Sequence, residues 1–175
     1  ISIEDKNFYN HNGFDPFTGV LSNPNDCDID TTYDIVFYKD GNEVSRIEYC
    51  LANNVSPKHN ELLWANSNIP KASDVDEVRL ENFATDFAFN DSIDATYELV
   101  SNDEVIGEYK FKFDKKPVVA SVSFLLYKDL NKNKKCDPGE VVITSTSSSF
   151  EKEDTFSYDG ESYDYDSVEV YYNAY

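Results

Sequence analysis

YDIVFYKDGNEVSRIEYC, residues 33–50, is the stretch of this 175-residue chain that decides its fold. Two runs rich in β-branched and aromatic residues flank the pair Asp40-Gly41. Both central positions of a two-residue hairpin turn need positive φ, which Gly adopts freely and Asp tolerates. The stretch therefore predicts an antiparallel β-hairpin.

A second hairpin is predicted at residues 95–113, with its turn at residues 101–103. Side chains alternate along its second strand, a pattern typical of a strand with one face in the core and one in water. One face carries Val105, Gly107, Tyr109, Phe111 and Phe113, and the other Ile106, Glu108, Lys110 and Lys112.

Further β-rich runs extend this pattern over the rest of the chain. Residues 118–127 are apolar or small on both faces, which is typical of a central strand. Weaker strands are predicted at residues 78–83, 141–146, 155–158 and 167–172, and short helical turns at residues 60–65 and 84–89. Strands at this spacing favour an all-β fold, either a β-sandwich or a jelly roll.

We expect residues 1–175 to form one domain. Residues 1–24 contain several Asn, Gly and Pro and are predicted to be loop-rich, although Ile1-Ser2-Ile3 fits an edge strand. Asp-Lys-Lys-Pro at residues 114–117 is a weak candidate for a domain boundary. The residues after it offer about four strands, too few for a second sandwich of the usual size.

The charge is strongly acidic, with 34 Asp and Glu against 15 Lys and Arg, a net charge of -19. A field of this sign repels phosphate backbones and attracts cations, so we expect no nucleic-acid partner. No stretch approaches the roughly 20 apolar residues of a membrane span, so no membrane insertion is expected.

The sequence favours a secreted protein. It begins at Ile1 and contains no Met, which fits a chain from which a leader has been removed. Its three cysteines have no zinc-site spacing, and a disulfide between Cys27 and Cys50 would leave Cys136 over. Three free thiols in a reducing compartment are the alternative.

The strongest chemical motif is the loop DLNKNKKCDPGE at residues 129–140. Calcium takes six to eight oxygen ligands and prefers a bidentate carboxylate to complete them. Counted from the first residue, side-chain oxygens fall at positions one, three, five, nine and twelve, and a backbone carbonyl at seven. The predicted ligands are Asp129, Asn131, Asn133, Lys135 (carbonyl), Asp137 and Glu140. Position six, usually Gly, is Lys134, where a left-handed backbone would cost about 1 kcal/mol.

The residues around this loop are strand-like, whereas an EF-hand would have helices on both sides. YKDLNKNKKCDPGE, residues 127–140, resembles the strand-connecting calcium loops of β-sandwich repeats in bacterial surface proteins, such as the B repeats of adhesins. The resemblance covers about twenty residues. It implies a calcium-binding, surface-exposed β domain with Asp129, Asn131, Asn133, Asp137 and Glu140 as side-chain ligands.

Asp26, Asp28 and Asp30 form a weaker candidate metal site. On a strand they would stack three carboxylates on one face, at a mutual cost unless a cation neutralises them. A solvated acidic surface is the favoured explanation for them.

We expect a non-catalytic protein. His11 and His59 lie in polar contexts without a surrounding motif, and the six scattered glycines form no phosphate-binding loop.

Two functions remain open. The first is an extracellular structural or adhesive module, or a filament subunit, that calcium stabilises and that assembles by strand addition through residues 1–3 or 167–172. Its partners would be copies of itself or neighbouring surface-protein domains. The second is a calcium-stabilised carbohydrate-binding module, in which Trp64 and the C-terminal tyrosines stack on a glycan.

Overall fold

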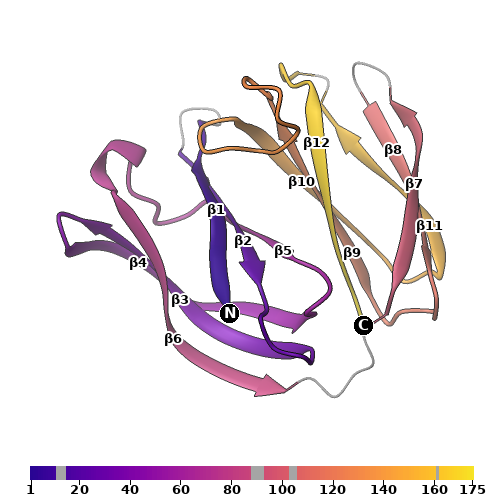
Figure 1. The fold of residues 1–175 in the computed structure, drawn as a ribbon, viewed down its shortest axis with the longest axis horizontal. Helices are drawn as coiled ribbons and strands as arrows, with labels where there is room; N and C mark the ends of the chain where they lie inside the picture. The colour runs from indigo at the N-terminus through magenta and orange to yellow at the C-terminus, as the bar shows by residue number, and fades with distance from the viewer. Residues whose placement is uncertain (11–14, 88–92, 103–105, 161) are drawn as a thin grey trace. The chain divides into compact units, whose positions relative to one another are not determined.

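The computed structural model describes residues 1–10, 15–87, 93–102, 106–160 and 162–175 (Figure 1). Within these ranges the chain forms twelve β-strands and one 3₁₀ turn, η1 (Ala72–Asp74), so the predicted all-β, sandwich-like fold is confirmed. The strands form four three-stranded antiparallel sheets. His11 and part of the predicted turn at residues 101–103 lie outside the described residues.

The contacts divide the chain into two compact units, Ile1–Phe89 and Asn90–Tyr175. Each unit contains two of the sheets and its own cluster of buried apolar side chains. This differs from the single domain expected from the sequence, because the strands before residue 89 complete two sheets and a core by themselves. The weak boundary at residues 114–117 lies inside the second unit, between two of its strands.

The first unit contains the sheets β1-β2-β5 and β4-β3-β6. Their strands are β1 (Ser2–Phe8), β2 (Phe17–Ser22), β3 (Ile29–Lys39), β4 (Asn42–Val55), β5 (Glu61–Ala65) and β6 (Glu77–Phe87). Phe17 and Leu21 from the first sheet and Ile35 and Phe37 from the second lie in one buried cluster. The rings of Phe17 and Phe37 meet edge to face, with centroids 5.5 Å apart.

The hairpin predicted at residues 33–50 is confirmed. β3 and β4 pair antiparallel, and Lys39 lies opposite Asn42. The two residues between them have positive φ, 50° at Asp40 and 76° at Gly41.

Two expectations for the first unit were wrong. Residues 1–24, predicted to be loop-rich, contain β1 and β2, and the predicted edge strand at residues 1–3 is the start of β1. Residues 60–65 and 84–89, predicted to be helical turns, contain β5 and the last part of β6. Both segments are short in isolation and become strands because β2 and β3 offer them pairing partners.

The second unit contains the sheets β10-β9-β12 and β11-β8-β7. Their strands are β7 (Ala95–Asn102), β8 (Ile106–Phe113), β9 (Ala120–Tyr127), β10 (Val141–Ser149), β11 (Glu153–Asp159) and β12 (Ser167–Ala174). β9 is the central strand predicted at residues 118–127.

The core of the second unit is aromatic. Phe111 and Phe113, on the predicted inner face of β8, are fully buried, and Phe111 meets Phe156 edge to face at 5.4 Å. Gly107 on the same face lies so close to the ring of Tyr158 that a Cβ at this position would overlap it. The alternation read from the sequence therefore sets which side of β8 joins the core.

Among the described residues, the search for long apolar helices finds none that could cross a membrane.

Candidate functional site

The predicted calcium loop, residues 129–140, connects β9 to β10, so strands flank it on both sides. Its first side chain folds back over the loop: Oδ1 of Asp129 accepts the backbone N–H of Asn133 at 3.0 Å, and Oδ2 accepts that of Lys134 at 2.8 Å. Oδ1 of Asn131 also accepts the N–H of Asn133, and Oδ1 of Asn133 accepts that of Lys135. The side chains at positions one, three and five therefore all turn toward the loop's own backbone.

Glu140, at position twelve, closes the loop. Its side chain is buried, with Oε1 accepting the N–H of Leu130 at 3.0 Å and Oε2 that of Asp137 at 2.9 Å. The backbone N–H of Lys128 also donates to the carbonyl oxygen of Glu140. Both carboxylate oxygens of Glu140 thus accept backbone N–H groups of the loop itself.

Three of the predicted ligands meet at one atom. Oδ2 of Asp137 accepts hydrogen bonds from Nδ2 of Asn131 at 2.6 Å and from Nδ2 of Asn133 at 2.7 Å. The three side chains are therefore joined by hydrogen bonds in which the two amide nitrogens face the carboxylate. The two amide oxygens accept backbone N–H groups of the loop instead.

The backbone of the loop is left-handed at position six, as the calcium-loop pattern requires. Lys134 has φ 63°, Lys132 has φ 62° and Gly139 has φ 91°. For the two lysines this conformation costs roughly 1 kcal/mol each. Lys134, which stands where the calcium-loop pattern usually has Gly, thus adopts the left-handed conformation at the cost of some backbone strain.

The segment leading into β12 and β12 itself hold the loop from outside. Oδ1 of Asp166 accepts the backbone N–H of Asp129 at 2.9 Å, and Oε1 of Glu169 accepts that of Cys136 at 2.9 Å. The hydrogen bond from Asp129 lowers the pKa of Asp166. These two residues lie some thirty positions away in sequence and carry no local motif, so sequence reasoning missed them.

Within the described part of the chain, no group of three or more His, Cys, Asp or Glu side chains is arranged to hold a metal ion. This holds for Asp129, Asp137 and Glu140 of the loop, which are not gathered into such a group in this structure. Two amides and a carbonyl would supply the other oxygens of the predicted calcium set.

The second metal candidate does not lie on one strand. Asp26 is exposed and Asp28 is buried, and both precede β3. Asp30 lies within β3, and its Oδ1 accepts the backbone N–H of Asn54 at 2.6 Å. The stack of three carboxylates expected for a strand is therefore not formed.

The predicted disulfide is not formed, and Cys27 and Cys50 are free thiols. Cys50 lies opposite Tyr33 in the pairing of β3 with β4. Cys27 precedes β3, which begins at Ile29. Both cysteines pack against the same apolar cluster of the first unit.

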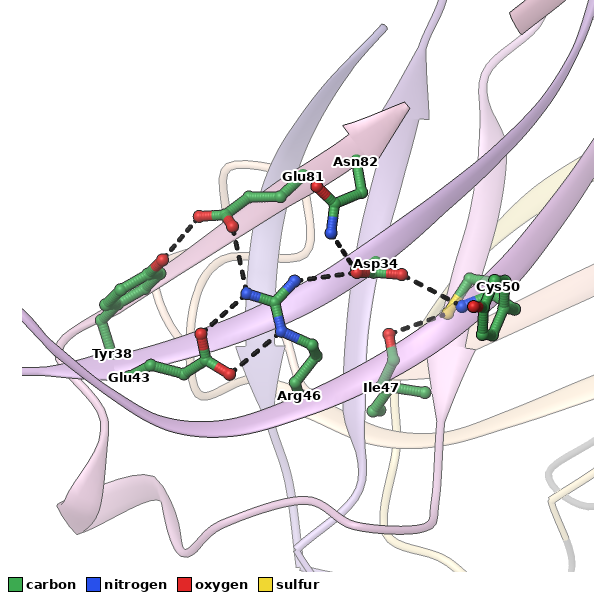
Figure 2. Close-up of polar contacts among 9 residues, drawn as sticks. Asp34, Tyr38, Glu43, Arg46, Ile47, Cys50, Glu81 and Asn82 are labelled. Carbon is green, nitrogen blue, oxygen red and sulfur yellow. Dashed lines mark hydrogen bonds and ion pairs between the residues drawn. The ribbon is translucent and has the colours of Figure 1, made fainter. Parts of the chain in front are cut away.

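An ion-pair cluster that the sequence did not reveal lies on β3, β4 and β6. Figure 2 shows Arg46 among three carboxylates, with Nη1 2.8 Å from Asp34 and Nη2 2.7 Å from Glu43 and 3.2 Å from Glu81. These hydrogen bonds raise the pKa of Arg46, and its guanidinium lowers the pKa of Glu43.

Asp34 in this cluster stabilises two irregularities of the sheet. Its Oδ2 accepts Nδ2 of Asn82 at 2.6 Å and its Oδ1 accepts the backbone N–H of Tyr49 at 3.1 Å (Figure 2). Both partners have positive φ, 53° and 59°, and lie near shifts in the strand register. The hydrogen bond from Asn82 is the main cause of the lowered pKa of Asp34. The cluster therefore has a structural explanation.

The first unit contains a cavity of about 440 Å³ at the side where β4 and β5 form the free edges of the two sheets. Glu61 reaches it from β5 and Tyr33 from β3. Leu21, Ile35, Ile47, Trp64, Asn66 and Ser67 also line it.

The second unit contains a cavity of about 670 Å³ with a tyrosine-rich wall. Tyr158, Tyr163 and Tyr165 line it together with Asn102, whose Oδ1 accepts the hydroxyl of Tyr158 at 2.8 Å. Asp164, Asp166, Ser167 and Val168 complete its lining.

Comparison of the chain with protein-family models, with curated proteins and with solved structures finds no match.

Proposed function

We propose that this chain is a non-catalytic structural or adhesive module of a cell surface or extracellular filament, which calcium stabilises at residues 129–140. The observation that carries the proposal is the convergence of Asn131, Asn133 and Asp137 on one point, with both oxygens of Glu140 held at the mouth of the loop. The net charge of -19 supports it, because such a surface attracts divalent cations.

The ion would stabilise the folded domain, because its binding is linked to folding. An ion that binds only the folded loop adds RT ln(1 + [Ca²⁺]/Kd) to the free energy of unfolding, about 2.7 kcal/mol at a hundredfold excess over Kd. The loop joins the central strand β9 to β10, and Asp166 and Glu169 tie it to the β12 side of the same sheet. Calcium would thereby hold together three strands of the second unit.

Thermal unfolding in calcium and in excess chelator tests this proposal. The parent should melt at a higher temperature in calcium, and Glu140→Ala should lose that increment. Because Glu140 also accepts two backbone N–H groups, the variant should melt lower even in chelator. The informative quantity is therefore the calcium increment of each protein.

Glu151→Gln is the matched control, since it removes an exposed carboxylate of the same unit that lies outside the loop. It should keep the full calcium increment. Equal melting temperatures of the parent with calcium and with chelator would refute the calcium part of the proposal.

Assembly by strand addition is the expected mode of partnership. β1 and β12, which contain the two segments considered for strand addition, each lie at the edge of a three-stranded sheet. Repulsion between chains of net charge -19 opposes association, and calcium would reduce it. Light scattering should therefore rise as calcium is titrated from micromolar to millimolar concentrations. A flat signal would refute calcium-dependent assembly.

The tyrosine-lined cavity of the second unit favours carbohydrate binding as a second candidate function. Aromatic rings stack on sugar faces, and Asn102 and Asp164 supply polar groups beside Tyr163. Soluble glucan and chitin oligosaccharides should then bind in calorimetry, and Tyr163→Ala should weaken them whereas Tyr175→Ala, outside the cavity, should not. Failure of both oligosaccharides to bind would remove this candidate.

A further inference from the structure

Aliphatic and polar groups together line the cavity of the first unit. Leu21, Ile35 and Ile47 contribute hydrocarbon, and Glu61, Asn66 and Ser67 are polar lining residues. A volume of about 440 Å³ falls within the range of small-molecule sites. The aliphatic part is suited to an apolar body of several carbon atoms.

Glu61 is the only charged side chain among the described residues that line this cavity. Its Oε2 is buried and has no hydrogen-bond partner within the described part of the chain. Burial raises the pKa of Glu61 to about 7, and the carboxylate in turn helps to raise the pKa of Tyr33 on the opposite wall. A buried carboxylate in this setting is costly without a partner, so a ligand that supplies one gains affinity from it.

We infer that the cavity binds a small organic ammonium ion, a primary amine carried on an apolar body. The ammonium group would donate to Glu61, the ring of Tyr33 would favour the positive charge, and the aliphatic side chains would take the hydrocarbon. Cations are also the ions that a chain of net charge -19 concentrates at its surface.

Charge distinguishes this occupant from others of the same size. A carboxylate would be repelled by Glu61, and an alcohol would supply one hydrogen bond without charge. The site lies in the first unit and the calcium loop in the second, so this inference and the proposed function can fail independently.

Three probes of equal chain length test the inference: n-hexylammonium, hexan-1-ol and hexanoate, at constant ionic strength. Isothermal titration calorimetry measures the affinity of each probe, and the fluorescence of Trp64, the single tryptophan of the chain and a lining residue, is a second readout. We expect hexylammonium to bind most tightly and hexanoate most weakly. Glu61→Gln should weaken hexylammonium by about 30-fold or more, as expected when one charge of a buried pair is removed. It should leave hexan-1-ol nearly unchanged.

Glu48→Gln is the control for net charge, because it removes an exposed carboxylate from β4 next to a lining residue, Ile47. It should bind hexylammonium as the parent does. The inference is overturned if hexylammonium and hexan-1-ol bind equally, if no probe binds, or if Glu61→Gln binds hexylammonium as tightly as the parent. If the fluorescence of Trp64 changes and saturates with protein concentration alone, a second copy of the chain occupies the cavity. This outcome also overturns the inference.

Discussion

Replacing Glu61 with Gln tests whether a carboxylate inside the first unit works against folding at neutral pH. Gln keeps the shape of the side chain and removes its charge. In the folded chain burial raises the pKa of Glu61 to about 7 from its ordinary value of 4.5. The folded protein therefore holds a proton on this group at pH values where the unfolded chain has released it.

The magnitude follows from the two pKa values. A pKa difference of one corresponds to 1.36 kcal/mol, so ionised Glu61 costs the folded state up to about 3 kcal/mol. The sign is that of a raised pKa: the stability contributed by the protonated group is complete below about pH 4.5 and is lost as the pH rises through about 7. Between about pH 5 and pH 8 the parent should lose roughly 2.5 kcal/mol more than Glu61→Gln.

Urea unfolding at a series of pH values, followed by the fluorescence of Trp64, measures this difference. Other carboxylates titrate alike in both proteins, so subtracting one stability curve from the other isolates Glu61. As the pH rises, the free energy of unfolding of Glu61→Gln should increase steadily relative to that of the parent. If the two stability curves run parallel over the whole series, the reasoning is refuted, and Glu61 is either solvated or paired in solution.

Three further predictions concern single positions. Lys134→Gly should raise the free energy of unfolding by about 1 kcal/mol, because φ is 63° there in the folded loop. Lys135→Gly, where no positive φ occurs, should only destabilise, and urea unfolding checks both. Gly107→Ala should cost about 3 kcal/mol in urea unfolding, because the ring of a tyrosine lies over this glycine. Gly41→Ala should cost only about 1 kcal/mol, because open space surrounds Gly41 and only its φ of 76° opposes a side chain. Equal costs would contradict the packing of the second core. Asp34→Asn should lower the free energy of unfolding at neutral pH. Because the pKa of Asp34 is lowered in the folded state, the stabilities of the parent and the variant should converge as the pH falls below about 3.8. A difference in stability that stays constant with pH would contradict the role given to the charge of Asp34.

Local signals predicted the parts of the fold that depend on adjacent residues. Asp40-Gly41 specified its hairpin because positive φ is a property of the turn itself. The alternation along β8 predicted which side chains enter the core, and the apolar run of β9 predicted a central strand. The oxygen spacing of residues 129–140 stays a prediction of an ion site; of its side chains, Asn131, Asn133 and Asp137 are joined to one another by hydrogen bonds.

Features that depend on distant partners were missed. β5 was predicted to be a helical turn, since five residues have no clear period until β2 pairs with them. The disulfide between Cys27 and Cys50 is not formed, and the distance between two cysteines depends on pairings that composition does not contain. Glu61 and Asp34 carry no sequence signal, because the cavity around one and the bulges around the other form only when strands far apart in the chain come together.

The contacts from the β12 side to the calcium loop also have a consequence for the order of folding. β9 and β10 form a local hairpin, whereas β12 is some forty residues from its partner in β9, so closing that contact costs more chain entropy. We expect the hairpin to form before Asp166 and Glu169 reach it. Calcium that orders the hairpin loop would then act on the transition state and accelerate folding, whereas loss of the β12 contacts would mainly accelerate unfolding.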